Sequence, residues 1–300
     1  MQKLKWILQL SRPRFWFYLI GPLLLGVASY VGFTFSPADG NFQAGLLLAL
    51  VFFSLPANLL IYGLNDLFDY ETDKHNPKKK AYESLLEPSQ RKTFTRLLSI
   101  VVLPPLLLLL ISLLFTATLN GGLSLSFNPN GVALWSLTAF LFFGIGYSVP
   151  PVRAKVRPFI DSFFNILYVF PGLVAYGILT EQFPPLQIII AATLWCMAMH
   201  AFSAVPDIIS DKKAHLATIA TKLGTRGTIM FCAVCYALAA SLTYEYLGIL
   251  SIIGSTLYLS LMYLSYTAKK AEDIFKIYTI FPYANVIFGF VLFWFIILTR

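Results

Sequence analysis

Residues 43–73 read QAGLLLALVFFSLPANLLIYGLNDLFDYETD, in which an uncharged apolar run from 43 to 64 leads directly into carboxylates. A helix needs about 20 mostly apolar residues to cross a bilayer, so this stretch predicts a membrane span with an acidic end. The whole chain fits the same environment, because 58% of its 300 residues are hydrophobic and only 12% are charged. In soluble domains about a quarter of the residues are charged. The sequence therefore predicts an integral membrane protein.

Runs of this kind recur along the chain and predict nine membrane spans. They cover 15–35, 43–64, 97–119, 132–149, 159–180, 186–206, 227–245, 247–266 and 279–298. We therefore expect an all-α polytopic membrane protein, a single domain over residues 1–300 with nine transmembrane helices. The weakest boundary separates the seventh span from the eighth, where only Tyr244, Glu245, Tyr246 and Gly248 interrupt the apolar residues. We expect no removable signal peptide, since the first apolar run is too long for one.

The net charge of +8 reflects how the basic residues are distributed. When the loops are assigned alternately to the two membrane sides, the side of the N-terminus holds every Lys and Arg except Arg300. By the positive-inside rule this side is cytoplasmic, which places the C-terminus on the opposite side and requires an odd number of spans. Basic residues scattered in this way record orientation, so we expect no nucleic-acid partner. The three cysteines lie within apolar runs and indicate core packing.

A first carboxylate cluster follows the second span, within Asn65–Asp73. If the helix continues, Asp66, Asp69 and Asp73 share one face, where three carboxylates repel each other unless a cation neutralises them. Carboxylate oxygens with an adjacent amide suit Mg²⁺, which binds a few carboxylates together with substrate phosphates. The alternative is a solvated acidic helix end that is balanced by the following lysines, Lys74, Lys78, Lys79 and Lys80.

A second cluster follows the sixth span, where Asp207 and Asp211 are four residues apart and lie on one helix face. The predicted topology puts it on the same membrane side as the first cluster. Two such acidic helix ends could each hold Mg²⁺ against one diphosphate. Metal ions would then neutralise the leaving group, an allylic C–O bond would ionise, and a nucleophile would capture the carbocation.

A basic loop closes the fourth span between the two clusters, in Tyr147–Arg157. Pro150 and Pro151 end the helix and favour an extended turn, so Arg153 and Lys155 are expected to project from one side of a stiff segment. Both are phosphate-binding side chains. A loop that only sets the membrane orientation is the alternative.

These motifs resemble those of the intramembrane aromatic prenyltransferases, the UbiA family, over nearly the whole chain. Asn65-Asp66-x-x-Asp69-x-x-x-Asp73 resembles its first Asp-rich motif, Tyr147-x-x-Pro150-Pro151-x-Arg153-x-Lys155 its central loop, and Asp207-x-x-x-Asp211 its second Asp-rich motif. The segment Ser11–Arg14 before the first span is also similar. The resemblance implies a nine-helix bundle around a central cavity. It also implies Mg²⁺-dependent cleavage of a prenyl diphosphate at the cytoplasmic end and transfer of the prenyl group to a lipophilic acceptor.

The resemblance also implies roles for single residues. Asp66, Asp69 and Asp73, assisted by Asn65, would carry one Mg²⁺ site, and Asp207 and Asp211 the other. Arg153 and Lys155 would bind the diphosphate, and Tyr147 would face the reacting carbons.

The chain departs from the family pattern at two positions. Many members have Arg where this chain has Asn58, so the cations for diphosphate must come from elsewhere, such as Lys155 or Lys78. A glycine that often follows the second motif is His215 here.

The residues in and around these motifs are similar to those of the lycopene elongases within this family. The stretches concerned are Phe68–Lys74 with Asn76–Lys78, and His200–Asp207. In that branch the donor is a C5 diphosphate and the acceptor is a carotenoid alkene. For this chain we expect dimethylallyl diphosphate or a longer prenyl diphosphate as the donor. The double bond of the carotenoid attacks the prenyl cation, and the new cation loses a proton or captures water. This reaction does not require the deprotonation of a phenol. It therefore fits the predicted spans, in which the one evident acid is Asp161.

Other functions are also consistent with parts of this pattern. The acceptor could be an aromatic quinone precursor or another polar-headed lipid. A secondary transporter would also be polytopic, although its site would lie near the bilayer midplane, whereas these acids lie at helix ends. His200, inside the sixth span, suits either a functional or a structural role.

Overall fold

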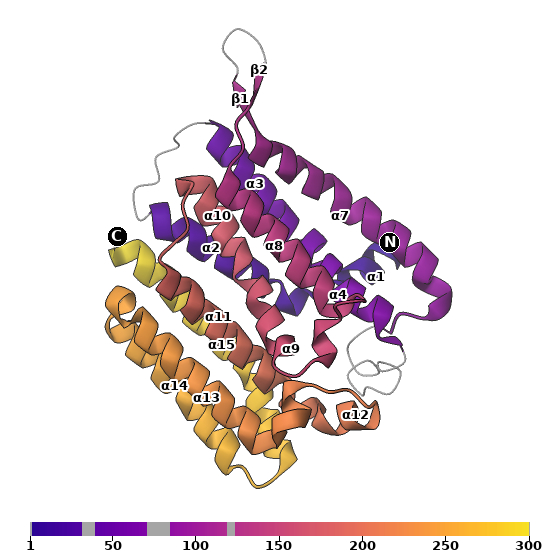
Figure 1. The fold of residues 1–300 in the computed structure, drawn as a ribbon, viewed down its shortest axis with the longest axis vertical. Helices are drawn as coiled ribbons and strands as arrows, with labels where there is room; N and C mark the ends of the chain where they lie inside the picture. The colour runs from indigo at the N-terminus through magenta and orange to yellow at the C-terminus, as the bar shows by residue number, and fades with distance from the viewer. Residues whose placement is uncertain (1, 32–39, 71–84, 119–123, 300) are drawn as a thin grey trace. The chain divides into compact units, whose positions relative to one another are not determined.

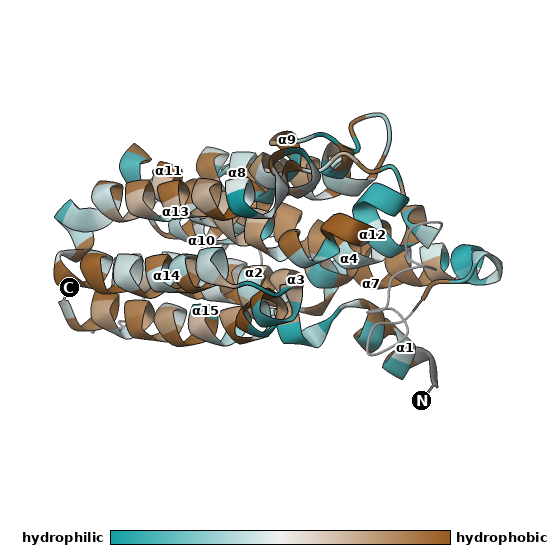
Figure 2. Ribbon diagram, turned by 90° about the horizontal axis from the view of Figure 1, so that it is seen from below, coloured by the Kyte–Doolittle hydropathy of each residue, from teal (hydrophilic) through white to brown (hydrophobic). Residues whose placement is uncertain are grey.

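The computed structural model describes residues 2–31, 40–70, 85–118 and 124–299 (Figure 1). The chain divides into two compact units. The first unit contains Met1–Val149, Phe170–Phe183 and Phe295–Arg300, and the second contains Pro150–Val169 and Pro184–Trp294. Each unit is helical, and Figure 2 shows hydrophobic residues along the long helices and hydrophilic residues towards helix ends, as on α12.

The first unit is built from helices and one short hairpin. Its elements are α1 (Gln2–Leu10), η1 (Pro13–Phe15), α2 (Phe17–Val31), α3 (Gly40–Phe53), α4 (Leu55–Phe68), η2 (Pro88–Gln90), α7 (Arg91–Leu114), β1 (Phe115–Thr118), β2 (Ser124–Phe127), α8 (Gly131–Ser148) and α10 (Phe170–Thr180). Helices α2 and α10 pack closely together at Gly26, where an added Cβ would overlap the carbonyl oxygen of Gly172.

The second unit contains the remaining elements. They are η3 (Ala154–Val156), α9 (Ile160–Phe163), η4 (Phe164–Tyr168), α11 (Leu186–Ser203), η5 (Val205–Asp207), α12 (Ile208–Lys213), α13 (Ile219–Leu247), α14 (Ile249–Thr267) and most of α15 (Ala271–Thr299). Its core is aromatic: the Tyr236 and Tyr258 rings stack 4.6 Å apart, and the Tyr258 hydroxyl donates to Asn285 Oδ1 at 3.1 Å. All three cysteines are buried, as expected for core packing.

Eight helical segments within the described ranges are long and apolar enough to cross a membrane. They are Ala44–Phe68, Pro88–Leu114, Gly131–Ser148, Ile160–Thr180, Leu186–Lys213, Ile219–Leu247, Ile249–Thr267 and Ala271–Thr299. They correspond to the second to ninth predicted spans, and the chain is a multi-pass membrane protein. The first predicted span, 15–35, reaches beyond the described residues, of which α2 covers Phe17–Val31.

The boundary that is weakest in the sequence is confirmed. Helix α13 ends at Leu247 and α14 begins at Ile249, with Gly248 between them at φ 50°. A positive φ is readily adopted by glycine and costly for most other residues. One glycine therefore separates two spans.

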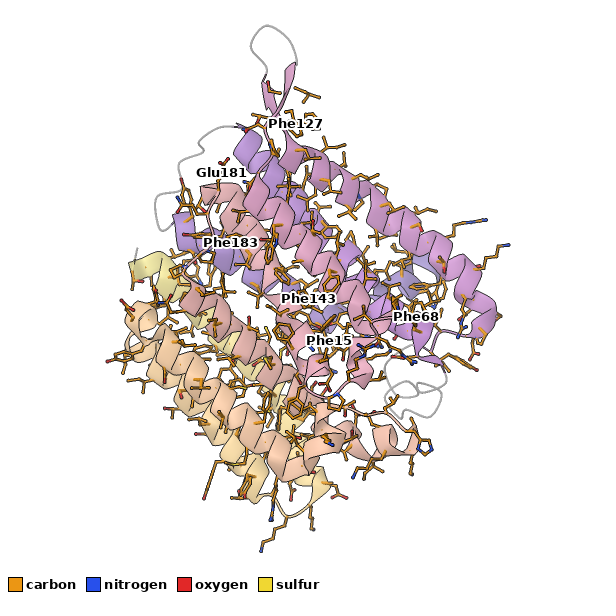
Figure 3. All side chains as sticks on the ribbon, in the orientation of Figure 1. Phe15, Phe68, Phe127, Phe143, Glu181 and Phe183 are labelled. Atoms are coloured by element: carbon orange, nitrogen blue, oxygen red, sulfur yellow. The ribbon has the colours of Figure 1, made fainter. Side chains whose placement is uncertain are left out.

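The third predicted span, 97–119, was wrong over 115–118, which was expected to be helical, and residue 119 lies outside the described residues. Helix α7 ends at Leu114, and Phe115–Thr118 pairs antiparallel with Ser124–Phe127. Aromatic and β-branched residues favour strands, and the Phe115 and Phe127 rings meet edge to face at 5.6 Å. Phe127 is labelled on this hairpin in the side-chain view (Figure 3). The all-α prediction therefore missed a short hairpin.

Candidate functional site

The first carboxylate motif lies at the end of α4. Asn65 and Asp66 are in its last turn, and Asp66 is buried, with 2% of its surface exposed. The helix ends at Phe68, and the backbone of Asp69 is no longer helical, with φ −110° and ψ 9°. The expected continuous helix through Asp73 is therefore interrupted at Asp69, and Asp73 itself lies outside the described residues, as does Lys78.

Arg12 supplies the counter-charge of Asp66. Its Nη2 donates to Asp66 Oδ1 at 2.8 Å, and its guanidinium also lies 5.0 Å from the ring centroid of Tyr62. Tyr62 is one helical turn before Asp66 on α4, so Arg12 contacts two side chains of that helix. The sequence marks Ser11–Arg14 as similar to the family's entry segment, but no local pattern pairs Arg12 with Asp66.

The end of α8 meets the end of α4. The Ser148 hydroxyl donates to Asn65 Oδ1 at 3.3 Å, and one turn earlier a Cβ at Gly144 would lie 3.1 Å from Ile61. Tyr147, half-buried, precedes Ser148 in the same turn. Within the first unit, Asn65 therefore lies beside the last turn of α8.

Asn58 lies two turns before Asn65 on α4 and has no exposed surface. Its Nδ2 donates to the carbonyl oxygens of Phe53 at 3.1 Å and Ser54 at 2.6 Å. The break between α3 and α4 falls at Ser54, near Pro56, which lacks an N–H. Asn58 stabilises this break in the helix, because its amide group donates hydrogen bonds to these two carbonyl oxygens. Its Oδ1 accepts no hydrogen bond from the described residues.

The part of the basic loop from Pro150 onward belongs to the second unit. Helix α8 ends at Ser148 as predicted, and Val149, before the two prolines, has an extended backbone at φ −92° and ψ 132°. The extended backbone does not continue through the basic residues, because Ala154–Val156 forms a 3₁₀ turn. Arg153 precedes this turn in the left-handed region at φ 39°. Lys155 is buried, with 8% exposed, which is rare for an ammonium group unless it is paired.

The second carboxylate motif has the expected local geometry. Asp207 ends η5 in a helical conformation and Asp211 lies in the first turn of α12, so the two share one face. Both are half-buried. His215, after this short helix, has φ 55°, which explains why glycine suits the position.

Asp161 has a structural role in the second unit. The carboxylate has no exposed surface, and it accepts from the backbone N–H of Ser162 at 2.8 Å and of Ile219 at 2.7 Å. It therefore ties the first turn of α9 to the start of α13.

The two carboxylate motifs lie in different units, so their approach to each other remains a prediction. Among the described residues no three His, Cys, Asp or Glu side chains are grouped as metal ligands. The side chains of Asn65, Asp66 and Asp69 carry oxygen atoms of the kind that Mg²⁺ prefers as ligands.

Comparisons with known proteins identify the family of this chain. The family model of the UbiA prenyltransferase family matches residues 19–297. A lycopene elongase/hydratase of Haloarcula japonica is 35% identical over 96% of this chain and 90% of its own length. A lycopene elongase/hydratase of Haloferax volcanii is 38% identical over 79% of this chain and 71% of its own.

Two solved structures share the fold at low identity. A UbiA homolog from Archaeoglobus fulgidus bound to DMAPP and Mg²⁺ has a TM-score of 0.64 at 19% identity, covering 96% of this chain and 99% of that one. A digeranylgeranylglyceryl phosphate synthase has a TM-score of 0.62 at 19% identity and covers both chains completely. Since the family model extends over nearly the whole sequence, this chain belongs to the UbiA prenyltransferase family.

Proposed function

We propose that this enzyme transfers a prenyl group from an allylic diphosphate, dimethylallyl diphosphate or a longer one, to the end of a carotenoid such as lycopene. The observation that carries the proposal is the similarity, over most of the chain, to curated relatives named lycopene elongase/hydratase. The sequences of Phe68–Lys74 and His200–Asp207, which resemble those of the lycopene elongases, support the proposal.

The residues at the end of α4 fit the metal that the family implies. Asp66, Asp69 and Asp73, with Asn65, would hold one Mg²⁺, and Asp207 and Asp211 the other. Bound Mg²⁺ would supply neutralisation of the diphosphate charge as the allylic C–O bond breaks. In the structure the cation beside buried Asp66 is Arg12, at 2.8 Å, so a bound Mg²⁺ would share this carboxylate with the guanidinium.

Basic and aromatic side chains would act on the organic part of the reaction. Arg153, Lys155 and Lys78 would bind the diphosphate, and Lys155 is already held out of solvent. Tyr147 would face the reacting carbons. The terminal double bond of the acceptor would attack the prenyl cation, and the resulting tertiary cation would lose a proton or capture water.

The membrane topology completes the proposal. A single domain over residues 1–300 would cross the membrane nine times around a central cavity, with the site at its cytoplasmic end. The N-terminus would be cytoplasmic and the C-terminus on the opposite side, because every Lys and Arg except Arg300 falls on one side.

Expression in a lycopene-accumulating host tests the acceptor. We expect C45 and C50 carotenoids to appear, and the purified enzyme to release diphosphate from dimethylallyl diphosphate only when lycopene and Mg²⁺ are present. The host without the chain is the control. An unchanged lycopene peak together with a prenylated hydroxybenzoate or naphthoate would favour the aromatic acceptor instead. Membership in a family of prenyl-transferring enzymes leaves the transporter alternative without support.

A further inference from the structure

Helix α7 has a buried side and a side that faces away from its own unit. The buried side chains are Phe94, Leu98, Val102, Leu109 and Leu113. The opposite side exposes large apolar residues, with Ile100 at 60%, Leu103 at 50%, Leu107 at 55% and Ile111 at 49%. Figure 3 shows side chains projecting from α7 along its length. In a membrane protein this exposed stripe is suited to contact lipid acyl chains.

Two basic residues continue the same stripe at the N-terminal end of α7. A helix turns about 100° per residue, so Lys92, Arg96, Ile100 and Leu103 fall within about 80° of one another. Lys92 and Arg96 are exposed, and with Thr93 and Leu97 they line a shallow hollow of about 420 Å³.

The dimensions place these cations at a membrane surface. From Leu97 to Leu114 the helix carries no charge and rises about 27 Å, close to the roughly 30 Å of a bilayer's hydrocarbon core. Lys92 and Arg96 therefore lie just beyond one end of the apolar length, at the depth of lipid phosphates.

The sequence supplies no carboxylate on α7 to neutralise the pair. Glu87 precedes the helix, where it forms a capping box with Gln90, and the next acid along the chain is Asp161. The face is thus positive at its end and apolar along its length, which is complementary to an anionic phospholipid.

We propose that this face of α7 is a binding site for one anionic phospholipid. The phosphate contacts Lys92 and Arg96 in the hollow, and an acyl chain runs along Ile100 and Leu103. Basic residues beside a membrane span attract anionic lipid with about 1 kcal/mol each, which corresponds to about fivefold in affinity per residue.

Native mass spectrometry of the purified enzyme tests this proposal, using phosphatidylglycerol and phosphatidylcholine with identical acyl chains. We expect the wild type to retain phosphatidylglycerol about 25-fold better. The double variant Lys92→Gln/Arg96→Gln should lose this preference, and each single variant should lose about fivefold. Arg91→Gln is the matched control, because Arg91 is exposed in the same turn but points to the other side of the helix.

Three outcomes would overturn the proposal. Equal retention of both lipids by the wild type would show that the pair is not selective. An equal loss in Arg91→Gln would show that only total charge matters. Displacement of the lipid by millimolar inorganic phosphate, or by a second copy of the chain, would identify a different occupant. Because all three positions are exposed, each variant is expected to fold.

Discussion

The guanidinium Nη2 of Arg12 lies 2.8 Å from Asp66 Oδ1, so the first carboxylate of the Asp-rich motif is neutralised by a residue that precedes the first span. Asp66 is almost completely buried, and Arg12 is mostly covered as well. Arg12 adopts a left-handed backbone, at φ 51°, immediately before Pro13. The segment between α1 and α2 is thus shaped to deliver one cation to the end of α4.

Replacing Arg12 should destabilise the fold, because Asp66 would remain buried without its counter-charge. Removing one partner of a buried ion pair costs about 3–5 kcal/mol, because the remaining charge is uncompensated. We expect Arg12→Gln to lower the free energy of unfolding by about 3 kcal/mol in EDTA. Mg²⁺ with a prenyl diphosphate should restore part of this loss, since bound metal would also neutralise Asp66. Thermal unfolding in detergent, with and without Mg²⁺, measures both effects.

Arg14→Gln is the control for that experiment, since Arg14 is exposed and its guanidinium lies 4.9 Å from the Phe15 ring centroid. It should leave the metal dependence of unfolding unchanged. If Arg12→Gln and Arg14→Gln shift the Tm equally, the Arg12–Asp66 pair has no particular role.

Single substitutions of the aspartates test the two-cluster site. We expect Asp66→Ala, Asp69→Ala and Asp211→Ala to reduce prenyl transfer by about 100-fold or more, the usual cost of losing one group that stabilises transition-state charge. Diphosphate release from the allylic donor measures the rate, and size-exclusion chromatography checks folding. Glu245→Gln, near the end of α13, should retain full activity. Retained turnover in any of the three variants would remove that carboxylate from the site.

The spans and motifs were predictable because they depend on local sequence. Length and hydropathy suffice to place a membrane helix, and Gly248 marks the break between α13 and α14 through its own backbone preference. The Arg12–Asp66 pair joins residues that are 54 positions apart, and no local pattern specifies it. The break at Ser54 depends on an amide four residues later, Asn58, so the apolar run around it resembles a continuous helix.

His215 offers a test of backbone strain in the second motif. A left-handed conformation costs a residue with a Cβ about 1–2 kcal/mol and costs glycine little. We therefore expect His215→Val to be about 1–2 kcal/mol less stable than His215→Gly, because β-branched residues tolerate positive φ poorly. Unfolding in detergent compares the two variants directly. Equal stability would show that the backbone of this turn relaxes when the side chain changes.

Asp161 should prove structural rather than catalytic, although it is the acid that stands out within the apolar sequence. Its two oxygens accept from Ser162 N–H and Ile219 N–H, at the first turns of two helices, where a negative charge is favoured by the helix dipole. Asp161→Asn would turn an amide group toward one of these N–H donors and lose a charged hydrogen bond, at a cost of about 1.5–3 kcal/mol. We expect a lower Tm, with the rate per folded molecule close to that of wild type, since the carboxylate has no exposed surface and its two oxygens accept from backbone N–H groups. Measuring kcat below the new Tm separates the two effects. A fully folded Asp161→Asn protein without prenyl transfer would instead place this carboxylate in the chemistry.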